Sequence, residues 1–248
     1  MRILITGGSG FIGSHLASHY QGQAEIVILD NLRSGHRQNL DGLDHTFIQG
    51  SVTDRATVDL AMTGVDVVFH LAAMISVPES MERPRECAEI NVLGLLNVLE
   101  SATAAGVRKV VLASSAAIYG DNPTVPKVET MFPEPKSPYA ITKLDGEYYL
   151  EMFRNEGKIQ TTSLRFFNVF GPRQDPRGHP TTLGIGPAQP VGSAMELGQQ
   201  LGARFRILHG QLQQIAQRSN LPLLQFARRR IGQSDDILRQ HCRFRIRI

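Results

Sequence analysis

The chain has 248 residues, 42% of them hydrophobic and 20% charged, which is enough to bury a sizeable core. Its two cysteines, Cys87 and Cys242, lack the spacing of a disulfide scaffold or a metal site, so no metal is expected and a reducing cytoplasm is the expected compartment. The first apolar run is far too short for a signal peptide or a membrane span, so no membrane partner is expected.

The first predicted element is a short apolar strand, Ile3 to Ile5, that leads into a glycine-rich turn and then a helix from Phe11 to about Tyr20. In the turn, Gly7 permits a tight bend, Gly10 lets the backbone approach a pyrophosphate, and Gly13 lets the helix pack closely on the strand. The first N–H groups of the helix face the phosphates. This strand–turn–helix context predicts a dinucleotide site, although the spacing is G-x-x-G-x-x-G rather than G-x-G-x-x-G.

The second predicted strand, Ile26 to Leu29, ends in Asp30, at about the distance where an acidic residue meets the adenosine ribose hydroxyls. A carboxylate at that point repels a 2′-phosphate, so NAD is favoured over NADP. Arg33 lies close by in sequence, so NADP stays open as the alternative cofactor. The alternative for Asp30 is a solvated turn residue at a strand end.

Strands and helices continue to alternate along the chain, which predicts an α/β fold: a Rossmann-like, doubly wound parallel sheet with helices on both faces. The further strands are expected at His45–Ile48, Asp66–Phe69, Lys109–Ala113 and Thr161–Phe166, and long helices at Arg85–Ala105 and Lys143–Phe153. Ligands bind beyond the carboxyl ends of such strands. One rim of the sheet should therefore carry the Gly7 turn, Asp30, His70 to Ala73, Ser114, Ser115 and Asn168.

Tyr139 and Lys143 are four residues apart, a spacing that places a phenol and an ammonium on one face of a helix. A neighbouring positive charge lowers the pKa of a phenol, so Tyr139 is a candidate general base near neutral pH. The pair also occurs by chance on amphipathic helices.

Seven stretches together resemble the extended short-chain dehydrogenases/reductases, and most of all the nucleotide-sugar 4-epimerases that act on UDP-glucose or UDP-N-acetylglucosamine. They cover about the first 178 residues. The stretches are Thr6–Gly13, Leu29–Leu32, His70–Ala73, Asn91–Gly94, Ser114–Gly120, Ser137–Tyr139 with Lys143, and Arg165–Pro176.

The resemblance implies NAD as cofactor and Ser115, Tyr139 and Lys143 as catalytic residues. It implies substrate contacts by Ser115, Tyr139 and Asn168. Where the family usually has an adenine-binding aspartate after the third strand, this chain has Ser51, followed by Val52 with its backbone groups. The expected cofactor-binding residues are Gly7, Gly10, Phe11, Ile12, Gly13, Asp30, Asn31, Ser34, Gly35, Ser51, Val52, Leu71, Ala72, Ala73, Asn91, Tyr139, Lys143 and Phe167.

The implied activity is an NAD-dependent isomerase of nucleotide-sugar metabolism, a 4-epimerase acting by transient C4 oxidation to a 4-keto sugar. Tyr139 would take the C4 hydroxyl proton, Lys143 would hold the phenolate and the nicotinamide ribose, and Ser115 would hydrogen-bond the reacting oxygen. Related dehydratases need an additional acid beside the serine, but here Ala116 and Ala117 follow it. Methyl groups cannot transfer protons, which argues for epimerisation.

Residues 179–248 differ in character from the NAD-binding domain expected at residues 1–178, with ten arginines, no lysine and three acidic residues. The family's nucleotide-sugar domain has no recognisable counterpart there. Three interpretations are open: a diverged short substrate domain, a nucleic-acid-binding extension, or a frameshift near His179. The frameshift is favoured, with the region partly helical or disordered. Scarce aromatic residues argue against nucleic-acid binding.

The rival to an active epimerase is an NAD-binding module or a truncated, inactive epimerase-like protein. The presence of Ser115, Tyr139 and Lys143 argues against a pure NAD sensor. An enzyme disabled by its C-terminal region remains an alternative interpretation. A homodimer is expected through the long helices near Arg85–Ala105 and Lys143–Phe153.

Overall fold

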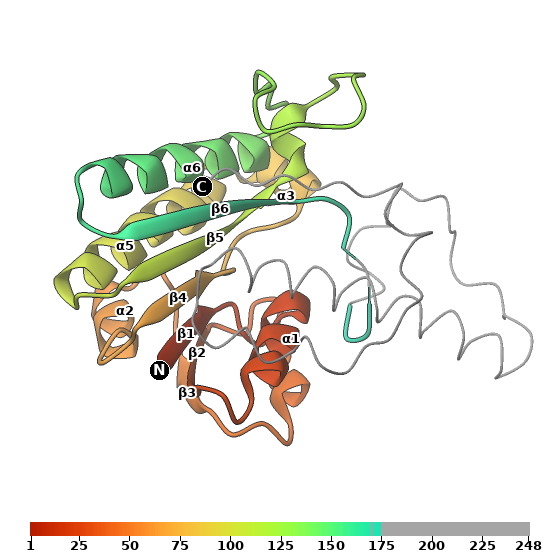
Figure 1. Ribbon diagram of the computed structural model, residues 1–248. Coiled ribbons are helices and arrows are strands. Elements are labelled where there is room, and N and C mark those ends of the chain that lie inside the picture. Colours follow the sequence, from red (N-terminus) through yellow and green to blue (C-terminus); the bar gives the residue numbers. More distant parts are fainter. Residues whose placement is uncertain (170, 175–248) are drawn as a thin grey trace, which may run out of the picture.

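A computed structural model describes residues 1–169 and 171–174 of the chain (Figure 1). Residue 170 and residues 175–248, which include the region expected to be partly helical or disordered, lie outside the described residues. The six strands of the described part are β1 (Arg2–Thr6), β2 (Glu25–Asp30), β3 (Thr46–Gln49), β4 (Val67–His70), β5 (Lys109–Ser115) and β6 (Gln160–Phe166). Each begins and ends within two residues of the strand predicted from its apolar run.

The strands form one parallel sheet in the order β3-β2-β1-β4-β5-β6. The strand order reverses between β1 and β4, where Thr6 pairs with His70 in register. In sheets of this kind the ligand crevice opens at that reversal, beyond the carboxyl ends of the strands. The predicted fold class is confirmed.

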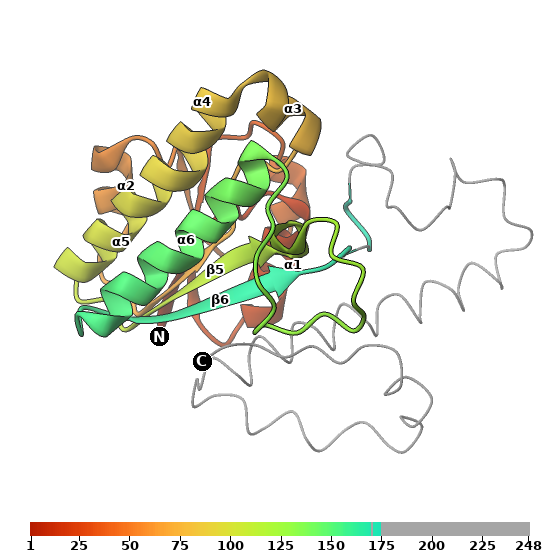
Figure 2. The ribbon, with the colours of Figure 1, turned by 90° about the horizontal axis from the view of Figure 1, so that it is seen from above.

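Helices cover both faces of the sheet. Helix α1 (Phe11–Tyr20) lies on one face, while α2 (Arg55–Ala61), α5 (Gly94–Ala104) and α6 (Pro138–Asn155) lie side by side on the other (Figure 2). Two shorter helices, α3 (Val77–Glu82) and α4 (Pro84–Ala88), follow β4 near the start of α6.

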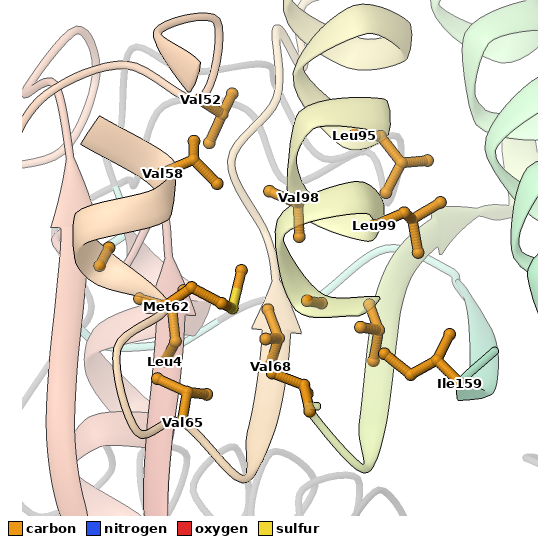
Figure 3. Packing of buried hydrophobic residues seen from close by; sticks show 14 of the residues in the cluster. Leu4, Val52, Val58, Met62, Val65, Val68, Leu95, Val98, Leu99 and Ile159 are labelled. Atoms are coloured by element: carbon orange, nitrogen blue, oxygen red, sulfur yellow. The ribbon is translucent and has the colours of Figure 1, made fainter. Parts of the chain in front are cut away.

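The four inner strands are largely apolar because both of their faces are buried, whereas the edge strands β3 and β6 carry more polar residues. Leu4 of β1 and Val68 of β4 pack under Val58 of α2 and Val98 of α5, all of them fully buried (Figure 3). Neighbouring residues along the strands point to the opposite face, where Ile3 belongs to a second core cluster beneath α1. The two cores fix the carboxyl edge of the sheet from both sides.

The long helix predicted at Arg85–Ala105 is interrupted. A π-helical turn, Glu89–Leu93, separates α4 from α5, and it carries Asn91. A single extra residue per turn leaves apolar spacings of three and four residues nearly unchanged, so the periodicity did not reveal it. Within the described residues, no helix is long and apolar enough to cross a membrane.

Candidate dinucleotide and catalytic site

The glycine turn after β1 requires glycine at two positions. Gly7 has a φ of +70°, and a Cβ at this residue would lie 2.8 Å from the backbone nitrogen of Ala72. A Cβ at Gly13 would collide with the carbonyl oxygen of Gly7. Gly10 is the residue preceding α1, and the half-buried Phe11 and Ile12 open the helix. The turn therefore presents the unpaired N–H groups of the first helical turn at the crevice.

Asp30 ends β2 beside this turn, with only 7% of its surface exposed. Its Oδ2 accepts a hydrogen bond from the backbone nitrogen of Ser9 at 2.9 Å, and its Oδ1 accepts one from Leu32 at 2.8 Å. These bonds hold the carboxylate next to the glycine turn. The alternative of a solvated turn residue is therefore wrong.

The segment after Asp30 packs onto the glycine turn. A Cβ at the buried Gly35 would lie 2.8 Å from the carbonyl carbon of Ser9, while Ser34 is exposed. Asn31 is exposed too, and its Oδ1 accepts a hydrogen bond from the backbone nitrogen of Arg33. The loop that follows Asp30 and the glycine turn after β1 thus pack against each other on this rim of the sheet.

Ser51 and Val52 follow β3. The Ser51 hydroxyl lies 2.8 Å from that of Thr53, and the Val52 carbonyl accepts a hydrogen bond from Asn97 of α5 at 3.0 Å. Val52 itself is buried. These contacts fix the segment that would flank an adenine.

The segment after β4 is tied to β1 through Thr6, a residue that was not among the predicted site residues. The Thr6 hydroxyl accepts hydrogen bonds from the backbone nitrogens of Leu71 and Ala72, both at 3.2 Å. The Thr6 hydroxyl in turn donates its own proton to Nδ1 of His70, which lies 2.9 Å away. Ala73 follows, partly exposed, at the start of the connection to α3.

Asn91 is buried on the π-helical turn and bridges three segments. Its side chain bonds both the nitrogen (2.7 Å) and the oxygen (3.1 Å) of the Met74 backbone, and it donates to the Thr142 hydroxyl at 3.0 Å. The buried amide therefore holds segments together and is not an exposed side chain on a helix face. Asn91 connects the segment after β4 to α6, the helix that carries Tyr139 and Lys143.

Ser115, Tyr139 and Lys143 meet at the carboxyl end of β5. The Ser115 side chain is close enough to the Tyr139 hydroxyl to lower the pKa of that phenol. The Lys143 ammonium donates to the Ala113 carbonyl at 2.7 Å and lies 5.7 Å from the centre of the Tyr139 ring. Ser115 also accepts a hydrogen bond from Ala117, so it both caps a turn and contacts the phenol.

The expectation that Lys143 lowers the pKa of Tyr139 is wrong in this structure. Burial raises the pKa of Tyr139, and the neighbouring Ser115 side chain opposes this only in part. The Lys143 ammonium is directed to a backbone carbonyl rather than to the phenol oxygen. The four-residue spacing did predict the shared helix face, but burial determines the direction of the pKa change.

Burial lowers the pKa of Lys143 from 10.5 to about 8. Burial, followed by the charge of Lys143, also lowers the pKa of His70 to about 3. His70 is therefore neutral at physiological pH, in agreement with Nδ1 accepting the Thr6 proton. The crevice holds one buried titratable ammonium whose pKa lies near the physiological range.

This buried ammonium makes the stability of the dinucleotide-free chain depend on pH. Between pH about 8 and 10.5 the folded state binds fewer protons than the unfolded state, so the free energy of unfolding rises with pH in that window. Near pH 7 the cost is about 3 kcal/mol, since one pKa unit corresponds to about 1.4 kcal/mol. We therefore expect Lys143→Met to stabilise the chain by about 2–3 kcal/mol near neutral pH, and the gain to disappear above pH 10.5.

Urea denaturation of both proteins across this pH range measures the difference, with the exposed Lys136→Met as control. A Lys143→Met chain that is less stable than wild type near neutral pH would contradict the expectation. So would a difference that does not change with pH.

Phe167 and Asn168 follow β6 and are exposed. The Phe167 ring stacks on that of Tyr119, with centroids 6.2 Å apart, and the Arg165 guanidinium lies 4.9 Å from the Tyr119 ring. This places Phe167 on the rim next to the segment that follows Ser115. Asn168 extends from the same strand end.

A charged network that was not predicted supports this end of the sheet. Glu147 of α6 accepts a hydrogen bond from Ser114 at 2.6 Å and pairs with Arg165 at 2.7 Å. It lies four residues after Lys143 and eight after Tyr139, a spacing that would have placed it on the same helix face. Glu147 thereby joins α6 to the ends of β5 and β6.

The geometry fits a dinucleotide. The glycine turn leaves no room for side chains, α1 offers its N-terminus, and the buried Asp30 carboxylate stands at the end of the neighbouring strand. Ser115, Tyr139 and Lys143 lie farther along the same edge. The fold and site together define a dinucleotide-binding domain that carries a serine–tyrosine–lysine group.

Residues 3–185 match the model of the NAD dependent epimerase/dehydratase family, and the chain belongs to that family. It is 41% identical over 192 residues to the UDP-glucose 4-epimerase of Mycolicibacterium smegmatis, covering 75% of this chain and 61% of that relative. The putative UDP-glucose 4-epimerase of Methanocaldococcus jannaschii is 37% identical over 186 residues, covering 74% and 61%. The chain thus spans about three fifths of the length of these relatives.

Two solved structures are similar as well. The UDP-glucose 4-epimerase of Thermus thermophilus, in complex with NAD, has a TM-score of 0.67 and 42% identity, covering 72% of this chain and 58% of that one. The UDP-N-acetylglucosamine 4-epimerase of Methanobrevibacter ruminantium, in complex with UDP-N-acetylmuramic acid, has a TM-score of 0.69 and 37% identity, covering 72% and 59%. The family resemblance found in the sequence is confirmed.

Proposed function

We propose that this chain is the NAD-binding and catalytic part of a nucleotide-sugar 4-epimerase acting on a UDP-sugar. The observation that carries the proposal is the contact between Ser115 and Tyr139 on the edge that also carries the glycine turn and Asp30. The similarity to UDP-glucose and UDP-N-acetylglucosamine 4-epimerases supports it.

Residues for the cofactor lie along the edge in the order of the strands. Asp30 would bind the adenosine ribose hydroxyls, and the glycine turn with the N-terminus of α1 would hold the pyrophosphate. Leu71 to Ala73, Lys143 and Phe167 would flank the nicotinamide half. When bound, NAD supplies reversible hydride chemistry, so the sugar is oxidised transiently and no net redox change results.

The chain's own residues would handle the proton. The Tyr139 oxygen would take the proton of the sugar C4 hydroxyl and return it afterwards, while the Ser115 hydroxyl hydrogen-bonds the same sugar oxygen. Because burial raises the pKa of Tyr139 in this structure, a positive charge close to the phenol oxygen is needed to favour the phenolate. In this structure the Lys143 ammonium is bound to the Ala113 carbonyl instead, and it would hold the nicotinamide ribose. Asn168 would contact the substrate from the end of β6.

A homodimer is part of the proposal. Ile141, Tyr148 and Met152 form a stripe on α6 whose residues are between 43% and 57% exposed. Leu93, on the π-helical turn that precedes α5, is 54% exposed. Large apolar side chains on the outer face of long helices are typical of a helix-to-helix subunit contact. The buried free Cys87 agrees with the reducing cytoplasm expected for the chain.

The rival function is an NAD-binding module without turnover. Residues 179–248 favour it, because they share no recognisable motif with the nucleotide-sugar domain of the family. We propose residues 1–178 as the NAD-binding domain and a frameshift near His179 as the origin of the difference.

The proposed function is tested by incubating the protein with UDP-glucose and NAD, and in parallel with the N-acetylated sugar, and following the C4 epimer by NMR. The test uses the 248-residue chain and a chimera in which residues after Gly178 are replaced by the corresponding part of the M. smegmatis relative. Epimer formation in the chimera supports the proposal. A chimera that binds NAD and converts neither sugar would overturn it in favour of the binding module.

A further inference from the structure

Arg33, three residues after Asp30, has both terminal nitrogens of its side chain bound to carboxylates. Nη1 lies 2.6 Å from Oε1 of Glu86, and Nη2 lies 2.8 Å from Oε1 of Glu79. The two glutamates belong to α3 and α4. Arg83, which is 60% exposed, lies 3.5 Å from Glu86 and 3.9 Å from Glu79, so two cations and two carboxylates form one cluster.

This cluster links two segments that follow the strands on either side of β1. Arg33 follows β2, α3 and α4 follow β4, and β1 with its glycine turn stands between those two strands in the sheet. The loop that carries Arg33 is fixed, because the backbone nitrogen of His36 donates to the Ser9 carbonyl at 3.1 Å and that of Arg33 to Asn31 at 3.0 Å. The guanidinium therefore extends from a well-fixed loop directly beside Asp30.

An arginine close to the acidic residue after the second strand is the group that accommodates the 2′-phosphate of NADP in dinucleotide-binding folds. Arg33 has that place in the chain, but its guanidinium is occupied. A 2′-phosphate would have to displace two carboxylates that already satisfy the guanidinium, and it would approach Asp30 and both glutamates while carrying negative charge itself.

We propose that Glu79 and Glu86 are specificity-determining residues: by binding Arg33 they withhold the cation that would recognise a 2′-phosphate, and so keep the site selective for NAD. The inference rests on the proposed NAD site and adds to it. Preference for NAD then has two sources, repulsion by Asp30 and occupation of Arg33.

The test is isothermal titration of the 248-residue chain with NAD and with NADP. Four proteins are compared: wild type, Glu79→Gln/Glu86→Gln, the same pair with Arg33→Met, and Glu82→Gln/Glu89→Gln. The last removes two exposed carboxylates from the same stretch of chain and controls for net charge. Glutamine at residue 79 preserves the helix start, where the Glu79 backbone nitrogen donates to the Ser76 side chain.

We expect Glu79→Gln/Glu86→Gln to raise the ratio of NADP to NAD affinity by about 10- to 100-fold, the effect of one hydrogen bond to a charged group. The control pair should leave the ratio near that of wild type, and Arg33→Met should abolish the gain. Using the ratio removes any change that affects both dinucleotides equally, such as loosening of the loop.

An unchanged ratio in Glu79→Gln/Glu86→Gln would overturn the inference while leaving the proposed function intact, provided that the wild type binds NAD. An equal gain in the control pair, or a gain that persists without Arg33, would overturn it as well. A wild-type chain that binds neither dinucleotide would overturn both this inference and the proposed function.

Discussion

Tyr139→Phe is expected to reduce epimerisation by about 10²- to 10⁴-fold, the usual contribution of a positioned general acid or base. The substitution removes only the phenol oxygen, which lies near the Ser115 side chain, and keeps the ring on the first turn of α6. NAD affinity should stay within a few-fold of wild type, because the dinucleotide contacts proposed for the glycine turn and Asp30 are untouched.

The comparison is made by NMR in the chimera and in the 248-residue chain, with NAD affinity followed by calorimetry. Tyr149→Phe is the matched control, since Tyr149 lies on the same helix but packs against the hydrophobic core. Turnover that survives Tyr139→Phe at most of its original rate would mean that Tyr139 is structural.

The second large effect concerns residues 179–248. Epimerisation requires a firm hold on the UDP half of the substrate while the sugar is repositioned, since remote binding energy keeps the reacting carbon in place. In the family that hold lies mostly in the C-terminal part. We therefore expect the 248-residue chain to bind NAD with little or no epimerase activity, and the chimera joined after Gly178 to reach ordinary enzyme rates, about 1 to 1,000 per second.

Rates at that level in the 248-residue chain would show that residues 179–248 are a working substrate domain, and the frameshift proposal would be wrong. The coding DNA around codon 179 offers an independent check. An alternative reading frame that encodes a recognisable counterpart of the family's nucleotide-sugar domain would support the frameshift.

The four inner strands were predictable because each is largely buried on both faces and therefore reads as an apolar run, as Ile26 to Leu29 does. Their parallel order then placed Asp30, Ser115 and the glycine turn on one edge. Short helices were harder: α2 and α3 have only seven and six residues, too few to show a clear period.

Contacts between distant residues were not predictable from local patterns. Arg33 meets carboxylates 46 and 53 residues away, and its sequence neighbourhood alone suggested a group available to NADP. The pKa of Tyr139 likewise depends on how deeply tertiary packing buries the phenol, whereas the sequence showed only that Lys143 shares its helix face. In both cases burial or long-range pairing, which local sequence patterns do not show, determines the chemistry of the residue.

The most direct test of the proposed function follows deuterium at C4. UDP-galactose labelled with deuterium at C4 is incubated with the chimera and NAD in ordinary water, and the UDP-glucose formed is examined by NMR. Transient oxidation at one site predicts that the product keeps its deuterium at C4 and that Tyr139→Phe stops its formation. Product that has lost the label to solvent, or that forms equally well after Tyr139→Phe, would contradict the account.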